Sequence, residues 1–262
     1  MNGRWVTSVA VAPMHAKPTF SSEMVSQSLF WDPIDVIEKK DNWNLIKSLD
    51  GYEAWMHSFY MHASSICSDR EIMIIDRNMP VFSKKNDLNS LQMVLSFGSK
   101  VPVLHEHEDS LEIAFPDETR GFISNDSFKV EKSRNDMLSL SRNLLGVPYL
   151  WGGTSSFGYD CSGFVQSLLK SLNMSIARDS SDQHDDYRLS KIDLEDAEPG
   201  DLIFFFEDDK INHVGFILEN NKIMHCSGEV KIESFNENDD DYNDELFKKK
   251  HVAKSIANLL ED

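Results

Sequence analysis

One cysteine in this sequence stands where a reactive thiol would be expected. Cys161 opens a segment, Cys161–Leu172, in which apolar residues recur at helical spacing, so the sequence predicts that it starts an amphipathic helix. The N–H groups and the positive end of a helix stabilise an anion, and we therefore expect the pKa of this thiol to be lowered. A buried structural cysteine is the alternative interpretation, because isolated cysteines are commonly buried.

His213 and His225 are the candidates for a catalytic base and for the group that orients it. Each lies in a short apolar run, and the turn residues Glu219–Asn221 between the runs predict a β-hairpin. Their separation of 12 residues is even, so a hairpin loop with an odd number of residues places both imidazoles on one sheet face, whereas a two-residue loop separates them. A helix-start cysteine followed by histidine and a polar orienter on neighbouring strands is the papain-type arrangement.

Several segments around these residues resemble the NlpC family of cell-wall cysteine peptidases. The segments are Gly146–Gly153, Asp160–Val165, Pro199–Phe205, His213–Gly215 and His225. They occur in order within about residues 133 to 230. The resemblance implies an α+β fold, with a papain-like catalytic domain in which the helix-start cysteine packs on an antiparallel sheet.

The residues before this domain form short strand-like runs separated by turn signals, a pattern that predicts small β-barrels. The runs are Trp5–Ala12, Pro33–Lys39, Trp43–Ser48, Tyr52–His57, Glu71–Ile75, Met79–Phe82, Lys100–His105, Leu111–Phe115 and Thr119–Ile123, with Leu88–Val94 as an inserted helical turn. Asp50–Met56 and Glu118–Ile123 both resemble the closing hairpin of bacterial SH3-like domains. We expect SH3-like barrels over residues 1–66 and 67–130 and the peptidase domain over residues 131–262.

Two further segments of the catalytic domain have predicted structures. Ser133–Leu145 is expected to form its first helix, with Ser133 as N-cap and Asp136 three residues on. Glu233–Glu245 is rich in Asp, Glu and Asn and is expected to be a solvated loop without an EF-hand pattern. Residues 245–260 show helical tendency.

Composition and charge exclude several classes of protein. A formal net charge of −18 argues against binding to nucleic acid or to an anionic membrane surface. No apolar run approaches the length of a membrane-spanning helix, and Met1–Ala10 lacks the apolar core of a signal peptide. The three cysteines form no CxxC pair and indicate no disulfide framework. We expect a cytoplasmic protein, although a periplasmic or secreted chain whose leader had been removed would look the same.

The residues assigned so far predict a metal-free and cofactor-free mechanism. Cys161 attacks an amide carbonyl, His213 acts as the base, and His225 accepts a hydrogen bond from His213 and fixes its tautomer. The backbone N–H of Cys161 and the hydroxyl of Tyr149 are the candidate donors to the oxyanion.

The substrate is implied by the resemblance alone. NlpC enzymes with two barrels resemble γ-D-glutamyl-L-diamino acid endopeptidases, which cut the peptide stem of peptidoglycan, and one subset prefers a free N-terminal L-Ala. The residues implied in substrate binding are Glu23, Tyr52, Trp151, Asp160, Ser162, Asp179 and Ser180. Asp160, Glu23 and Tyr52 would bind the ammonium group, Ser180 in its Arg178–Ser180 segment the α-carboxylate of D-Glu, and Trp151 would wall the cleft. An ordinary surface carboxylate is the alternative for Glu23.

Three other functions stay open at this point. The same fold could carry out acyl transfer or act as an amidase on another amide. The chain could also bind wall peptides without catalysis, although the intact set of Cys161, His213 and His225 argues against it. A redox protein would need a resolving thiol, for which Cys226 is the candidate. The sequence indicates no oligomeric state.

Overall fold

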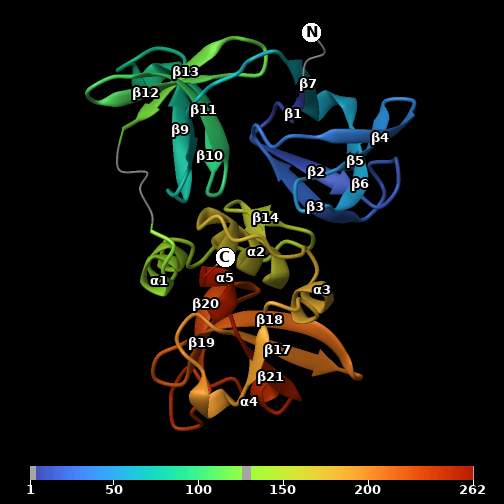
Figure 1. Cartoon of the computed structure of the whole chain (residues 1–262), viewed down its shortest axis with the longest axis vertical. Helices are drawn as coiled ribbons and strands as arrows, with labels where there is room; N and C mark the ends of the chain where they lie inside the picture. Colours follow the sequence, from blue (N-terminus) through green and yellow to red (C-terminus); the bar gives the residue numbers. More distant parts are fainter. Residues whose placement is uncertain (1–3, 126–130, 262) are drawn as a thin grey trace. The chain divides into compact units, whose positions relative to one another are not determined.

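The computed structural model describes residues 4–125 and 131–261. The chain divides into two compact units, residues 1–129 and residues 130–262 (Figure 1). The first unit is built almost entirely from strands, and the second combines helices with one large antiparallel sheet.

Two antiparallel sheets make up most of the first unit. The five-stranded sheet has the order β3-β2-β6-β5-β4, and the six-stranded sheet has the order β10-β9-β13-β12-β11-β8. The elements are β1 (Arg4–Thr7), β2 (Val11–His15), β3 (Met24–Leu29), β4 (Asp35–Lys40), β5 (Trp43–Lys47), β6 (Glu53–His57), η1 (Ser58–Tyr60), β7 (Met61–Ser64), β8 (Glu71–Met73), β9 (Asn78–Phe82), η2 (Leu88–Ser90), β10 (Leu91–Ser96), β11 (Lys100–Glu106), β12 (Ser110–Ala114) and β13 (Arg120–Ser124). The division into barrels at residues 66 and 67 stays a prediction.

Most strands predicted for this unit are present, with four differences, one of which is that strand β7 was not predicted. The run Trp5–Ala12 is two strands, β1 and the start of β2, and the predicted helical turn is the short η2 followed by strand β10. Strand β3 was not predicted, because its buried positions include Ser26 and Ser28. Serines on the inner face hide the apolar alternation by which a strand is recognised. The Ser28 hydroxyl is satisfied by a hydrogen bond with the hydroxyl of Thr7, at 2.6 Å.

The second unit is a six-stranded antiparallel sheet with helices packed against it. The sheet order is β16-β21-β17-β18-β19-β20. The elements are α1 (Arg134–Arg142), β14 (Thr154–Ser155), β15 (Gly158–Tyr159), α2 (Cys161–Ser171), α3 (Ser180–His184), β16 (Ser190–Ile192), η3 (Leu194–Asp196), β17 (Leu202–Glu207), β18 (Lys210–Leu218), β19 (Lys222–Ser227), β20 (Glu229–Ser234), α4 (Asp244–Phe247), β21 (His251–Ser255) and α5 (Ala257–Glu261). Helix α2 packs on β18 and β19, where the rings of Phe164 and Phe216 meet edge to face.

The predicted first helix of this unit is confirmed. Ser133 is the N-cap of α1, and its hydroxyl accepts the N–H of Asp136 at 3.1 Å. Arg134 anchors the helix through an ion pair at 2.8 Å with Asp201, whose side chain is only 1% exposed. The carboxylate of Asp201 also accepts the N–H of Ile256, so one buried acid joins both ends of the unit.

Two predictions for the end of the chain are only partly right. Residues 235–243 lie outside the named helices and strands, and helices α4 and α5 form, but each predicted segment also contains strand residues. Residues 251–255 are strand β21, which lies between β16 and β17, and not part of a helix. Hydrogen bonding to a neighbour on each side outweighs the weak helical tendency of this mixed segment. Glu233 belongs to strand β20 and not to a solvated loop, and its side chain faces His225. No helix among residues 4–125 and 131–261 is long and apolar enough to cross a membrane.

Candidate active site

Cys161 is the first residue of helix α2, as predicted. Asp160 is the N-cap, and its carboxylate accepts the backbone N–H of Gly163 at 2.7 Å. The pairing of β18 with β19 ends at Gly215 and His225, so the strands separate beside His213 and Val214. The backbone N–H of Val214 donates to the sulfur of Cys161 there. Cys161, the candidate nucleophile, is thus held against the strand that carries the candidate base.

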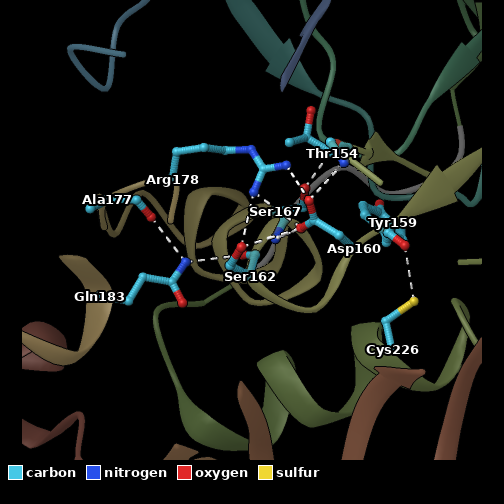
Figure 2. Close-up of polar contacts among 11 residues, drawn as sticks. Thr154, Tyr159, Asp160, Ser162, Ser167, Ala177, Arg178, Gln183 and Cys226 are labelled. Atoms are coloured by element: carbon cyan, nitrogen blue, oxygen red, sulfur yellow. Dashed lines mark hydrogen bonds and ion pairs between the residues drawn. The ribbon is translucent and has the colours of Figure 1, made fainter. Parts of the chain in front are cut away.

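A buried ion pair fixes the start of this helix. Figure 2 shows the guanidinium of Arg178 reaching both Asp160 and Ser162. Its nitrogens lie 2.5 and 3.1 Å from the two carboxylate oxygens of Asp160 and 3.0 Å from the Ser162 hydroxyl. Asp160 also accepts the N–H of Gly152 at 3.0 Å. Its carboxylate therefore joins the Gly152 turn, the first turn of α2 and Arg178.

Glycine is required where α2 passes the turn before it. A Cβ built on Gly163 would lie 2.1 Å from the carbonyl oxygen of Gly153, a distance that no side chain tolerates. The sequence around Cys161 is therefore constrained by backbone packing as well as by chemistry.

The two histidines lie on one sheet face, which is the outcome that the parity argument gave for an odd loop. Strands β18 and β19 are joined by residues 219–221, an odd loop in which Asn220 and Asn221 adopt positive φ. Both imidazoles lie on one face, with Nε2 of His213 2.6 Å from Nδ1 of His225. Gly215 stands directly opposite His225, and a Cβ there would lie 2.8 Å from that of His225. The missing side chain leaves room for the imidazole pair.

Glu233 is a member of this cluster that sequence analysis missed. Its Oε2 lies 2.9 Å from Nε2 of His225, which is 1% exposed. Burial works to raise the pKa of Glu233, but hydrogen bonds from His225, Lys231 and Asn243 outweigh it and lower the pKa to about 2. His225, the candidate orienting residue, therefore has an ionised carboxylate hydrogen-bonded to its Nε2. In the sequence, the only sign of this position was that Glu233 lies in a run of strand length, residues 229–234, which follows the hairpin directly.

Burial reverses the direction of the pKa shift that was predicted for Cys161. It raises the pKa of the Cys161 thiol to about 11, and Asp160 adds to the rise, although the N–H groups of Val214 and Ser162 act against it. Burial also lowers the pKa of His213 to about 3, aided by His225. The expectation of a lowered thiol pKa at the helix start is wrong, because desolvation outweighs the helix end. Thiol and imidazole therefore rest uncharged.

The other predicted residues of this unit lie around Cys161 or in the segment after α2. Tyr149 is 37% exposed, and burial raises its pKa to about 12 with Cys161 and Asp160 close enough to contribute. Trp151 is exposed, and Ser162 is buried. Asp179 is the N-cap residue of α3, and Ser180 is its first residue. Their roles in substrate binding stay predictions.

The remaining two predicted residues belong to the first unit. Glu23 is exposed and directly precedes β3. Tyr52 is half-buried before β6 and packs against the apolar core of the five-stranded sheet. Their assignment to the ammonium site stays a prediction.

Cys226 is placed unlike a resolving thiol. It is buried, and its Sγ donates to the carbonyl oxygen of Tyr159 at 3.1 Å (Figure 2). Burial raises its pKa to about 12, so little thiolate is available for exchange. Among the residues described here, no group of three His, Cys, Asp or Glu side chains is arranged to hold a metal ion.

Known protein families and individual proteins resemble this chain in sequence. Residues 146–250 match the NlpC/P60 family, and residues 14–58 match the bacterial dipeptidyl-peptidase Sh3 domain. Two curated proteins, both named gamma-D-glutamyl-L-lysine dipeptidyl-peptidase, are similar to this chain. The Bacillus cereus protein is 24% identical over 229 residues, which are 79% of this chain and 68% of that protein. The Bacillus subtilis protein is 28% identical over 215 residues, which are 76% and 71%.

A solved structure shows the same fold. It is an NlpC/P60 family protein from Bacillus cereus, with a TM-score of 0.80 and 19% sequence identity over 97% of this chain and 99% of that one. The fold and the family match together define a papain-like cysteine peptidase. More narrowly, the chain is a hydrolase with an NlpC/P60 catalytic domain and an N-terminal bacterial SH3 domain, which confirms the resemblance found in the sequence.

Proposed function

We propose that this peptidase cuts peptides derived from peptidoglycan between γ-D-Glu and the following L-diamino acid, and that it prefers a free N-terminal L-Ala. The observation that carries the proposal is the similarity, over 79% and 76% of the chain, to two dipeptidyl-peptidases named for the γ-D-glutamyl-L-lysine bond. A dipeptidyl-peptidase releases two residues from an amino terminus, so its site has to recognise a free ammonium group.

The first chemical step combines proton transfer with attack. As substrate binds, the Cys161 thiol passes its proton to Nδ1 of His213, the ring nitrogen not engaged with His225. The electron pair of sulfur forms a bond to the amide carbon, and the carbonyl π electrons move to oxygen. The N–H of Cys161 and the hydroxyl of Tyr149 donate to that oxygen. Proton transfer accompanies attack because thiol and imidazole rest uncharged.

The second step releases the amine. The oxygen re-forms the carbonyl, the C–N bond breaks, and the proton on Nδ1 of His213 passes to the leaving nitrogen. The first product is the diamino acid, and the dipeptide stays bound to Cys161 as a thioester. His213 then takes a proton from water, whose oxygen attacks the thioester, and the thiol is restored when the proton returns to sulfur.

Recognition of the ammonium group is assigned to Asp160 together with Glu23 and Tyr52. Arg178 already offsets the charge of Asp160, so this carboxylate alone holds a substrate cation weakly. A second carboxylate is therefore needed, and Glu23 is the residue that the resemblance supplies. The predicted cytoplasmic location stays a prediction.

Two substrates test the proposal. Free L-Ala-γ-D-Glu-L-Lys and its N-acetyl form are incubated with the protein and with the Cys161→Ala variant, and products are read by mass spectrometry. We expect L-Ala-γ-D-Glu and lysine from the free tripeptide, cleavage of the acetylated form at least about tenfold slower, and no product with the variant. Equal kcat/KM for the two peptides removes the amine preference. No cleavage of either peptide rejects the proposed function.

A further inference from the structure

The carboxylate of Glu233 extends the histidine pair into a chain of three hydrogen-bonded groups. The links are Glu233 Oε2 to His225 Nε2 at 2.9 Å and His225 Nδ1 to His213 Nε2 at 2.6 Å. All three residues lie on one face of the sheet, since His225 pairs with Gly215 and Glu233 with Ile223. The side chains of His225 and Glu233 are 1% and 14% exposed, so water competes little for these bonds.

We propose that Glu233 is a positioning residue that sets the tautomers of both histidines, so that Nδ1 of His213 carries no proton and can accept the one on Cys161. The proposal deepens the proposed function and rests on the roles given there to Cys161 and His213.

The proton positions on these three side chains follow from which of their atoms can only accept a hydrogen bond. An ionised carboxylate can only accept, so Nε2 of His225 has to carry a proton. In neutral His225 the other nitrogen, Nδ1, is then an acceptor, and Nε2 of His213 has to donate to it. In neutral His213 this leaves Nδ1 as a lone pair. The opposite tautomers would place a proton on that atom and leave nothing to accept the thiol proton.

Other groups hold Glu233 in its acceptor role. Lys231 donates to Oε1 at 2.6 Å, and the side-chain amide of Asn243 donates to Oε2 at 2.7 Å. Both neighbours are donors, and together with His225 they keep the carboxylate ionised and its plane fixed. A carboxyl group that carried a proton at this site could let His225 flip; these neighbours prevent it.

Charge gives Glu233 a second effect on the same base. The charged groups that act on His213 are Glu233, Lys231 and Lys249, with His225 in contact. Glu233 raises the pKa of His213, whereas the two lysines and His225 lower it. When His213 takes the thiol proton it becomes an imidazolium, which the negative charge of Glu233 stabilises through His225.

Two variants separate these effects. In Glu233→Gln the amide oxygen fits at the position of Oε2, to which both His225 and Asn243 donate. The amide NH2 group then takes the position of Oε1, and the partly exposed Lys231 side chain can move away from it. This variant keeps the acceptor and loses the charge. Glu233→Met, of similar length, loses both. Asp241→Asn is the matched control. It removes a carboxylate that lies 2.7 Å from Lys222, a residue of the same strand as His225, and it does not change the contacts of the histidines.

Imidazole ¹⁵N chemical shifts of the full chain report the tautomers directly, with signals assigned by His213→Phe and His225→Phe variants. We expect Nε2–H tautomers for both histidines in the wild type and in Glu233→Gln. In Glu233→Met we expect loss of that single tautomer state. On the free tripeptide, kcat should fall about tenfold in Glu233→Gln and about a hundredfold in Glu233→Met, the range found for groups that act through a neighbour. The acid limb of kcat/KM should move to lower pH in Glu233→Gln, and Asp241→Asn should match the wild type.

Several results would overturn the proposal. An Nδ1–H tautomer of His225 in the wild type does so whether or not any variant folds. Wild-type kcat and tautomers in Glu233→Met do so as well. The outcome is distinct from that of the proposed function: a wild type that shows the expected tautomers but cleaves neither tripeptide supports the role of Glu233 and rejects the substrate.

Discussion

Replacing Arg178 by methionine should loosen the helix that carries the nucleophile. Arg178 is 3% exposed, and its guanidinium makes two hydrogen bonds to Asp160 and one to Ser162. Methionine fills a similar volume but leaves the carboxylate of Asp160 buried without its cation. Breaking a buried ion pair from one side costs about 3–5 kcal/mol, because the remaining charge stays desolvated. Since 1.4 kcal/mol is a factor of ten, opening of the helix start should become between about a hundred and a few thousand times more frequent.

Hydrogen–deuterium exchange of the full chain measures this opening in peptides that cover residues 161–171. Asp160→Asn should also speed exchange, since it leaves Arg178 unpaired by charge. The double variant Asp160→Asn with Arg178→Met should recover much of the protection, because both charges are gone and the asparagine oxygen can still cap Gly163. Arg188→Met is the control, since Arg188 pairs with Asp186 at 2.6 Å outside α2. Additive effects of the two single changes would refute the buried-pair reasoning.

Three further predictions concern the catalytic groups. Gly215→Ala places a Cβ 2.8 Å from that of His225 and should lower kcat by about tenfold or more without unfolding the chain, as read by circular dichroism. The rate at which iodoacetamide alkylates Cys161 should rise steadily between about pH 7 and 9, because the pKa of the thiol is about 11. The rate is measured from the mass of the alkylated peptide in a Cys67→Ser background, and a plateau near neutrality would contradict this prediction. The pKa of His213 is lowered from 6.5 to about 3, so between these two pH values the imidazole takes up a proton only when the chain is unfolded. Stability should therefore decrease as the pH falls from about 6.5 toward 3, by up to about 1.4 kcal/mol per pH unit, and the urea midpoints of His213→Phe should depend less on pH.

The sequence revealed the parts of the site that depend on local pattern. The start of a helix at Cys161 was predicted from the apolar spacing that follows it, and the structure confirms this start. The parity of the separation between His213 and His225 indicated one shared face once an odd loop was assumed, and the loop of residues 219–221 is odd.

Features that depend on three-dimensional surroundings escaped prediction. The pKa of Cys161 is set by burial, which outweighs the helix end that the sequence shows. Glu233 looked like the first residue of an acidic loop, because only strand pairing with Ile223 brings it beside His225. Strand β21 was missed since its stability comes from β16 and β17, which precede it in the chain by many residues.

The bond between Glu233 and Asn243 has a consequence for how related sequences should diverge. Asn243 uses both ends of its amide: its NH2 group donates to Glu233, and its oxygen caps α4 by accepting the N–H of Leu246 at 2.9 Å. A substitution at either position leaves the other with an unmatched polar group, so the two should change together in lineages that alter the histidine pair. Glu237 and Asp240, exposed between them, should drift freely. Asn243, at the end of an acidic surface loop, should therefore vary together with Glu233 and the histidine pair.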